Sequence, residues 1–169
     1  MDKIALKYSQ INPELVITGL RYFNVYGQRE FYKGTTASMV IQLAHQILDG
    51  KKPRLFEGSK KIMRDFIHIN DVVKACINAC SPKENGIYNI GTGVSRSFQD
   101  IADILQKELN TNFSTEYFIN PYKGYQNNTK ADIKLSEENL NFKPLLSLES
   151  GIKEYLPEII KIFNQNNND

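Results

Sequence analysis

The chain has 169 residues, which is enough for one domain with a hydrophobic core of its own. Its net charge of +2 argues against a surface for nucleic acid or membranes, and no apolar run approaches the roughly 18 residues of a membrane span. The start, MDKIALKY, has neither the apolar centre nor the cleavage site of a signal peptide, so we expect a cytoplasmic protein without nucleic-acid or membrane partners.

Helices and strands are predicted to alternate along the chain, which indicates an α/β fold. Hydrophobic periodicity, turn residues and capping residues set the expected bounds of each element. In the first third of the chain we expect a helix over 1–12, a strand over 15–23 and a helix from Thr35 or Thr36 through Leu48. Next come short strands in 53–59 and 63–69, a helix capped by Asn70 or Asp71 that ends near Ser81, a strand over 86–91 and a helix after an imperfect capping box of Ser97 and Asp100. The last part has a strand in 114–120, a polar loop over 120–131, a short helix over 132–140, a helix from Ser147 to about Phe163 with a kink at Pro157, and a disordered tail over 164–169.

The strand over 15–23 indicates the kind of sheet. Its apolar residues run almost without interruption from Leu15 to Leu20, which predicts burial on both faces. Strands of this type are typical of a parallel sheet that helices cover on both sides.

The only two cysteines are Cys76 and Cys80. Four residues apart on a predicted helix, they share one face, and without a nearby histidine they make a poor metal site. This helical spacing does not suit a disulfide either. We therefore predict two small core residues and no metal site.

The stretch LRYFNVYGQREFYKG is the first candidate for chemistry. A strand that ends at Asn24 brings an amide to the carboxyl edge of the sheet, where α/β proteins bind ligands. A structural turn at Gly27 explains the same residues equally well. Lys33, just before a predicted helix, is a candidate anion clamp or acid/base group, although most loop lysines simply face solvent.

The stretch LFEGSKKIMRDFIHINDV is the second candidate. Arg64 lies in an otherwise apolar strand and needs a partner, either Asp65 or a diphosphate that it grips with two hydrogen bonds. Phe56 offers a flat face for a base ring. The residues Glu57, Gly58 and Ser59 supply a polar turn.

Three further features carry weaker signals. The glycines of NIGTG do not form a cofactor fingerprint, because Arg96 occupies the place of the third glycine. Tyr125 lies in a polar loop and either covers a ligand or anchors the loop. His68 is interpreted as a structural histidine rather than a ligand.

Six stretches occur in a recognisable order: LRYFNVYGQREFYKG, RLFEGS, RDFIHINDVV, GIYNIGTG, KGYQ…AD and FKPLLSLESGIKEYL. In this order they resemble the C-terminal part of the extended short-chain dehydrogenases/reductases that act on nucleotide sugars. The resemblance covers residues 1–163. FNVYG-x-RE-x-x-x-KG followed by LFEGS is more specific, and it resembles the 6-epimerases of ADP-heptose, which serve bacterial lipopolysaccharide synthesis.

The resemblance implies an isomerase that uses NADP (or NAD) to oxidise the sugar at carbon 6 and to reduce it again from the opposite face. It implies two acid/base groups, a tyrosine from the N-terminal half and Lys33, and a homo-oligomer. It implies contacts to the ADP-sugar from Asn24, Thr35, Gln42, Phe56, Glu57, Gly58, Ser59, Arg64 and Tyr125, and to the cofactor from Val25. Thr35 keeps the hydroxyl of the family's serine, whereas Gln42 replaces a histidine.

Two elements of that family pattern have no counterpart in the sequence. None of the nine tyrosines has a lysine four residues later, and no glycine-rich fingerprint precedes Asn24. Residues 1–12 resemble the back half of the helix that begins with the tyrosine–lysine pair. We therefore expect a fragment that is inactive alone: a substrate-binding part over 1–163, with remnant Rossmann elements near 1–27 and 86–93 and without the N-terminal cofactor domain.

A fragment of this kind has a physical consequence. The strands over 15–23 and 86–91 would belong to an incomplete sheet, and their unpaired edges and apolar faces are expected to associate or to pack differently from the family. Two other interpretations stay open. The chain is the same half of another nucleotide-sugar dehydratase or epimerase, or it is a native, shortened binding or partner protein.

Overall fold

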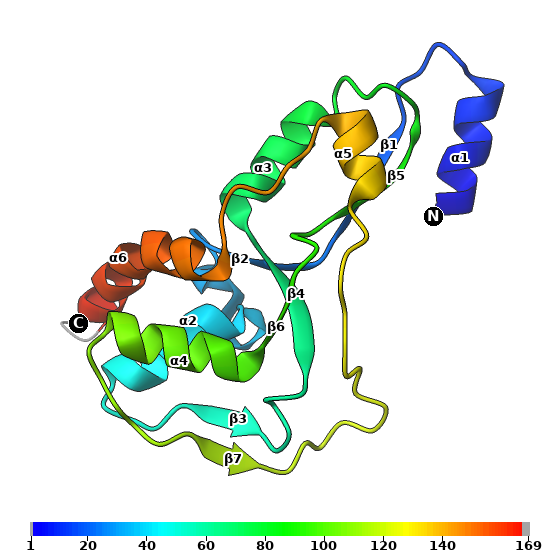
Figure 1. Ribbon diagram of the computed structural model, residues 1–169. Helices are drawn as coiled ribbons and strands as arrows, with labels where there is room; N and C mark the ends of the chain where they lie inside the picture. The colour runs from blue at the N-terminus through cyan, green and yellow to red at the C-terminus, as the bar shows by residue number, and fades with distance from the viewer. Residues whose placement is uncertain (1, 167–169) are drawn as a thin grey trace.

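The computed structural model describes residues 2–166, and Figure 1 shows how their elements are arranged. Helices and strands alternate, which confirms the α/β class. Across these residues, no helix combines the length and the apolar character that crossing a bilayer requires. The elements are α1 (Asp2–Ile11), β1 (Thr18–Tyr22), β2 (Asn24–Tyr26), the 3-10 helix η1 (Phe31–Thr36), α2 (Met39–Leu48), β3 (Arg54–Phe56), β4 (Met63–His68), α3 (Ile69–Asn78), β5 (Gly86–Ile90), β6 (Ser95–Ser97), α4 (Phe98–Glu108), β7 (Glu116–Phe118), α5 (Lys134–Leu140) and α6 (Leu148–Asn166).

Within the described residues, the strands form three small groups. β1 pairs in parallel with β5, and β3 pairs in parallel with β7. β4 lies between its parallel partner β2 and the antiparallel strand β6. Because only Phe23 separates β1 from β2, the chain passes directly from the first group to the central one.

The larger core lies between α2, α4 and α6, which Figure 1 shows grouped together. Helix α2 presents one apolar face at the spacing of a buried amphipathic helix, as predicted: Val40, Leu43, Ala44 and Ile47. Helix α4 begins with a complete capping box. Asp100 N donates to Ser97 Oγ (3.0 Å), and Ser97 N donates to Asp100 Oδ2 (2.9 Å).

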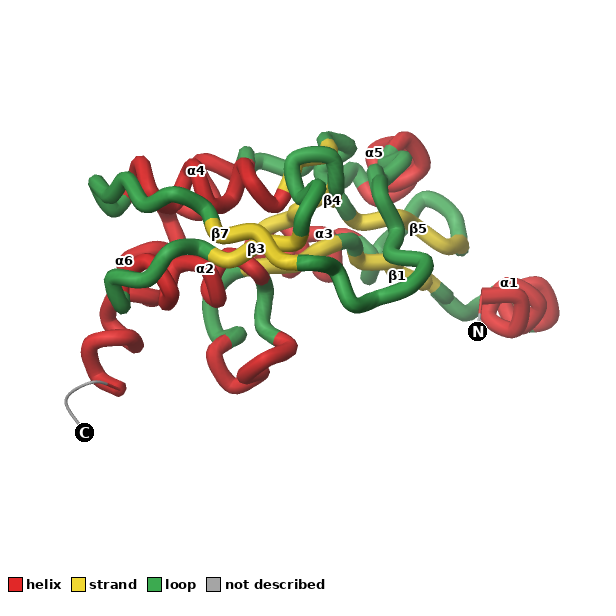
Figure 2. The backbone as a smooth tube through the Cα atoms, turned by 90° about the horizontal axis from the view of Figure 1, so that it is seen from below, coloured by secondary structure: helices red, strands yellow, loops and turns green. Residues whose placement is uncertain are grey.

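A smaller core lies between β5, α3 and α5. Its buried side chains are Ile67, Val72, Ala75, Ala79, Tyr88, Ile90, Leu140 and Phe142. Helix α1 contributes no buried residue, and Figure 2 shows it at one end of the molecule, apart from the other helices.

Two predictions about this smaller core are wrong. The strand over 15–23 is not buried on both faces, because it begins only at Thr18 and Val16 and Tyr22 are 61% and 49% exposed. The cysteines are not core residues, since Cys76 is half-buried and Cys80 is exposed. A run of apolar residues shows which side chains favour burial, but not whether another element covers them.

Several predicted helix ends are also wrong. Helix α2 begins after Ser38 rather than after Thr35 or Thr36, because residues 31–36 form a separate 3-10 helix. Helix α3 is capped by His68, whose side chain accepts from Asn70 N (3.3 Å). This cap role agrees with a structural histidine.

At the C-terminus, α6 contains Pro157 and continues to Asn166. The predicted disordered tail is therefore wrong for residues 164–166. Its last three residues, 167–169, lie outside the described residues.

Candidate functional site

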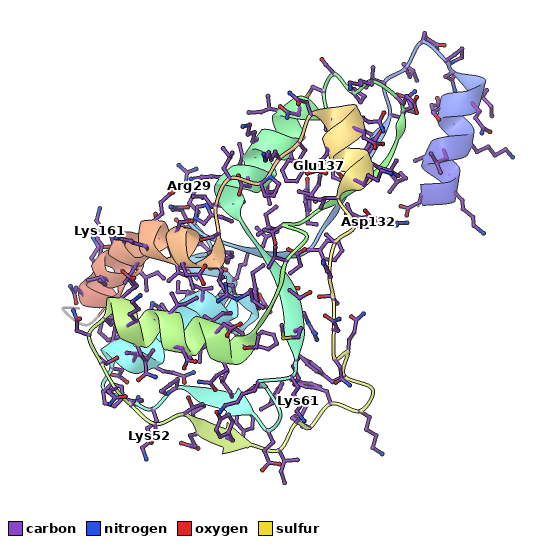
Figure 3. All side chains as sticks on the ribbon, in the orientation of Figure 1. Arg29, Lys52, Lys61, Asp132, Glu137 and Lys161 are labelled. Carbon is purple, nitrogen blue, oxygen red and sulfur yellow. The ribbon has the colours of Figure 1, made fainter. Side chains whose placement is uncertain are left out.

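A cavity of about 260 Å³ lies between α2, the β3–β7 pair and the start of α4. Its wall consists mostly of apolar and aromatic side chains: Met39, Gln42, Gln46, Arg54, Leu55, Phe56, Ser59, Phe98, Phe118 and Tyr125. Figure 3 labels Lys52, shortly before β3, and Lys61, in the turn region between β3 and β4, and shows them near opposite ends of β3. A concave, mostly apolar wall with a few polar groups is typical of a small-molecule site.

Phe56 is the centre of an aromatic cluster at this cavity. Its ring packs edge-to-face against Phe118 (5.0 Å between centroids), Tyr122 (6.1 Å) and Tyr125 (5.7 Å). Tyr122 and Tyr125 stack on each other at 6.4 Å. Flat aromatic faces of this kind suit a planar, polarisable ligand such as a nucleobase.

Ser59 supplies a polar group to the same wall. It is only 1% exposed, and its Oγ has no hydrogen-bond partner among the described residues. A buried hydroxyl without a partner costs about 1–3 kcal/mol. Because Ser59 lines the cavity, a ligand atom there would satisfy the hydroxyl.

Two guanidinium groups lie beside the aromatic cluster. Arg64 lies over Tyr125, 5.0 Å from its ring centroid, and donates to Met63 O (2.8 Å) and Gln126 O (2.5 Å). Arg54 lies over Phe118 at 5.1 Å and forms an ion pair with Glu116 (3.0 Å). The bonds of Arg64 to Met63 O and Gln126 O use two of its five N–H donors. The other three are left for an anionic group.

The alternative partner predicted for Arg64 is wrong. Asp65 points to the opposite face of β4, since neighbouring residues in a strand alternate between faces. Its carboxylate accepts from Thr92, Gly93 and Ala131 instead of from Arg64. Backbone carbonyls and aromatic rings therefore surround the Arg64 guanidinium.

A second cavity, of about 280 Å³, lies where β2 leads into η1. Its wall contains Val25, Tyr26, Gly27, Gln28, Arg29, Glu30, Lys33 and Ile69. Gly27 has φ +136°, and a Cβ there would lie 2.5 Å from the Ile69 side chain, so this wall requires glycine. The site combines an apolar surface with the exposed ammonium group of Lys33.

Glu30 fixes the shape of the segment that carries Lys33. Its buried carboxylate accepts from Ser38 N (2.8 Å), Ser38 Oγ (2.7 Å) and Gly27 N (3.4 Å), so it joins the two ends of residues 27–38. Burial and the negative charge of Glu30 raise the pKa of Tyr155, which therefore stays a neutral phenol.

The structure brings some of the predicted site residues together. Gln42, Phe56, Ser59 and Tyr125 line the first cavity with Arg64 packed on Tyr125, whereas Val25 and Lys33 line the second. Across the described part of the chain, four predicted residues are exposed and line neither cavity: Asn24, Thr35, Glu57 and Gly58. Thr35 contributes only its carbonyl, which accepts from Gln42 Nε2 (3.2 Å).

Sequence reasoning missed Arg54 and Phe118. The register of β3 and β7 places Arg54 opposite Glu116 and Phe56 opposite Phe118. The sequence contains a signal for this pairing, because RLF and EYF each have a charged residue two positions before a phenylalanine, with charges of opposite sign.

Comparison with known proteins shows the family of the chain. Residues 1–91 match the NAD dependent epimerase/dehydratase family. The chain is 42% identical over 155 residues to the ADP-L-glycero-D-manno-heptose-6-epimerase of Brachyspira hyodysenteriae, a match that covers 88% of this chain and 47% of the relative.

Solved structures give the same result. The ADP-L-glycero-D-manno-heptose-6-epimerase of Helicobacter pylori matches with a TM-score of 0.86 and 44% identity, over 95% of this chain and 48% of that one. The UDP-glucose 4-epimerase of Thermotoga maritima, solved with UDP-glucose, matches with a TM-score of 0.84 and 29% identity, over 95% and 51%. The chain thus spans about half the length of the relatives that it matches.

Proposed function

Because the chain belongs to the NAD dependent epimerase/dehydratase family, we propose that it is the substrate-binding part of an ADP-glycero-manno-heptose 6-epimerase. The observation that carries the proposal is the first cavity, where an aromatic cluster and the buried, unpartnered hydroxyl of Ser59 lie beside two guanidinium groups. The 42% identity to a heptose epimerase supports the choice of sugar.

We propose that the first cavity holds the ADP end of the substrate. Phe56 and Tyr125 offer faces for the adenine, and Ser59 offers a hydrogen bond. Arg64, packed behind Tyr125, is the proposed partner of the diphosphate through the N–H groups that Met63 O and Gln126 O do not use. Gln42 also lines this cavity, and Asn24, Thr35, Glu57 and Gly58, which line neither cavity, remain proposed contacts to the ADP-sugar. A cavity of about 260 Å³ fits a nucleoside rather than a whole nucleotide sugar, so the heptose extends beyond it.

We propose that the second cavity serves the reacting sugar carbon. Lys33 is the proposed acid/base group, which holds or moves a proton at the hydroxyl of carbon 6. Glu30 keeps the Lys33 segment in one conformation through its bonds to Gly27 and Ser38.

NADP is the proposed cofactor, and Val25 its proposed contact. The apolar wall formed by Val25 and Ile69 next to Lys33 fits the nicotinamide end of such a group, but not a whole dinucleotide. When bound, the cofactor supplies hydride acceptance and hydride return. Because none of the tyrosines has a lysine four residues later, we expect these 169 residues alone to turn over no ADP-heptose. A homo-oligomer and a cytoplasmic location remain predictions.

Isothermal titration of the chain with ADP, UDP, GDP and dTDP tests the proposal. We expect ADP to bind most tightly. Phe56→Ala should weaken it about 5- to 150-fold, since stacking of a base on an aromatic ring contributes about 1–3 kcal/mol. Tyr22→Ala, at an exposed aromatic residue outside both cavities, is the matched control and should leave ADP affinity unchanged. Tighter binding of UDP would identify the chain with another nucleotide-sugar enzyme, and binding of none would reject the proposed site.

A further inference from the structure

The start of β4 holds the segment that carries Tyr125. Met63 N donates to Asn127 O (2.8 Å), and Thr129 N donates to Met63 O (3.1 Å). Arg64 donates from one face of the strand to Gln126 O (2.5 Å). Residues 126–129 therefore lie along β4 through hydrogen bonds to two successive residues.

Asp65 holds the far end of the same segment from the opposite face of β4. Its carboxylate is fully buried and accepts from Ala131 N (3.0 Å). It also accepts from Thr92 N (2.7 Å), Thr92 Oγ1 (2.7 Å) and Gly93 N (2.8 Å). One side chain thus joins β4, the turn after β5 and the segment that leads back to Tyr125.

The local packing leaves no room for a looser arrangement. A Cβ on Gly91 would lie 2.9 Å from Asp65 Oδ2 and 2.6 Å from the Ala131 Cβ. The four donors from Thr92, Gly93 and Ala131 match the four acceptor positions of a carboxylate. No neutral side chain of this size can accept four hydrogen bonds. An asparagine would keep one acceptor oxygen and would direct an amide N–H₂ toward backbone donors.

We propose that Asp65 is a positioning residue for the nucleotide site, because it fixes the end of residues 125–131 and thereby holds Tyr125 against Phe56. This inference rests on the proposed function, since the ligand that Tyr125 would contact is the ADP end of the substrate. Asp65 lines neither of the two cavities described above and acts only through the segment.

Asp71 provides a matched control. It is 2% exposed and accepts from Leu145 N and Leu146 N, both at 3.1 Å. It therefore performs the same task for the segment before α6, and lines neither of the two cavities. Asp65→Asn and Asp71→Asn remove the same charge from equally buried carboxylates that bind backbone amides.

The test combines amide hydrogen exchange with titration of ADP. Asp65→Asn should speed exchange in residues 125–131 and weaken ADP binding about tenfold, whereas Asp71→Asn should change ADP binding less than about twofold. If Asp65→Asn does not fold, Thr92→Val removes one donor to the carboxylate. That variant should change both measurements in the same direction, by about threefold for ADP.

The outcomes separate the two proposals. Equal effects of Asp65→Asn and Asp71→Asn on ADP affinity, or unchanged exchange in residues 125–131, would overturn the positioning role. A wild-type chain that binds no ADP would overturn the proposed function and the ligand part of this inference. The exchange measurement would then still decide whether Asp65 holds the segment.

Discussion

The region that carries the first cavity and the region around β1 and β5 differ in how their apolar side chains are covered. In the first, α2, α4 and α6 bury their apolar faces against one another, and Leu43 and Ile101 are fully buried. In the second, Val16 and Ile77 are more than 60% exposed, and α1 buries nothing. Both regions contain similar apolar residues, so the difference lies in what covers them.

This difference shows where the stability of the chain comes from. Buried apolar area drives folding, at roughly 25 cal/mol for each Å² removed from water. The cavity-bearing region therefore has the larger core. The region around β1 and β5 has only the smaller core, and the outer side chains there, with those of α1, stay exposed. The arrangement within the chain nevertheless matches that of a heptose epimerase over 95% of its residues.

The largest expected effect compares two truncations to alanine. Leu43→Ala removes a fully buried side chain from the larger core and should lower the free energy of unfolding by about 3 kcal/mol. Val16→Ala, in the exposed surface, should change it by less than about 0.5 kcal/mol. Urea unfolding followed by circular dichroism measures both. Equal losses would mean that Val16 is covered in solution, and the contrast between the regions would fail.

A second prediction concerns the junction of the two regions. His68 is fully buried, and its ring packs edge-to-face against Tyr26 at 5.3 Å. Burial lowers its pKa, although the charges of Glu154 and Asp71 partly offset this effect. As pH falls below about 6.5, the unfolded chain gains a proton that the folded chain resists, so the free energy of unfolding should decrease.

Unfolding in urea at pH 7.5 and at pH 5.5 tests this sign. His68→Asn keeps a capping side chain for α3 but cannot be protonated, so it should flatten the pH dependence. His45, whose pKa burial also lowers, is half-buried on α2 with its ring against Phe163, and His45→Gln should flatten the pH dependence that remains. A wild-type chain that is more stable at pH 5.5 would contradict the assigned burial of both histidines.

Local patterns in the sequence predicted much of this molecule. The apolar spacing of α2 and the capping box of α4 are each formed by residues a few positions apart in the chain. Both predictions are confirmed. The prediction that Phe56, Ser59 and Tyr125 belong to one site remains a proposal, but the structure does gather them at one cavity. These residues could be predicted because each belongs to a short motif, and the motifs occur in a recognisable order along the chain.

The errors come from distant contacts. Helix α2 begins later than predicted because the backbone N–H of Ser38 donates to the carboxylate of Glu30, eight residues earlier. Capping rules consider only residues within about one helical turn, so they do not predict this bond. The predicted burial of the strand over 15–23 is wrong, because an apolar run does not show whether another helix or strand packs against it. The role of Arg54 depends on the register between β3 and β7, which are about 60 residues apart.

The smallest expected effect tests whether the β1 surface stays uncovered. Cys80 is exposed, whereas Cys76 is half-buried with its Sγ 3.2 Å from the Tyr22 hydroxyl. Both line a groove with Val16 and Leu20. A thiol reagent should therefore modify Cys80 faster than Cys76 in dilute protein. Because large exposed apolar patches favour association, both rates should fall as the protein concentration rises.

Substitutions at the surface complete this test. Val16→Lys adds a charge to the groove and should remove the concentration dependence, with little change in the rates at low concentration. Ile119→Lys is the matched control, because Ile119 is equally apolar and 77% exposed but follows β7 in the cavity-bearing region. If both lysine variants act alike, association does not involve the β1 surface. If Cys80 reacts slowly even in dilute protein, another part of the chain covers the groove, and the two regions are less different than their exposed side chains indicate.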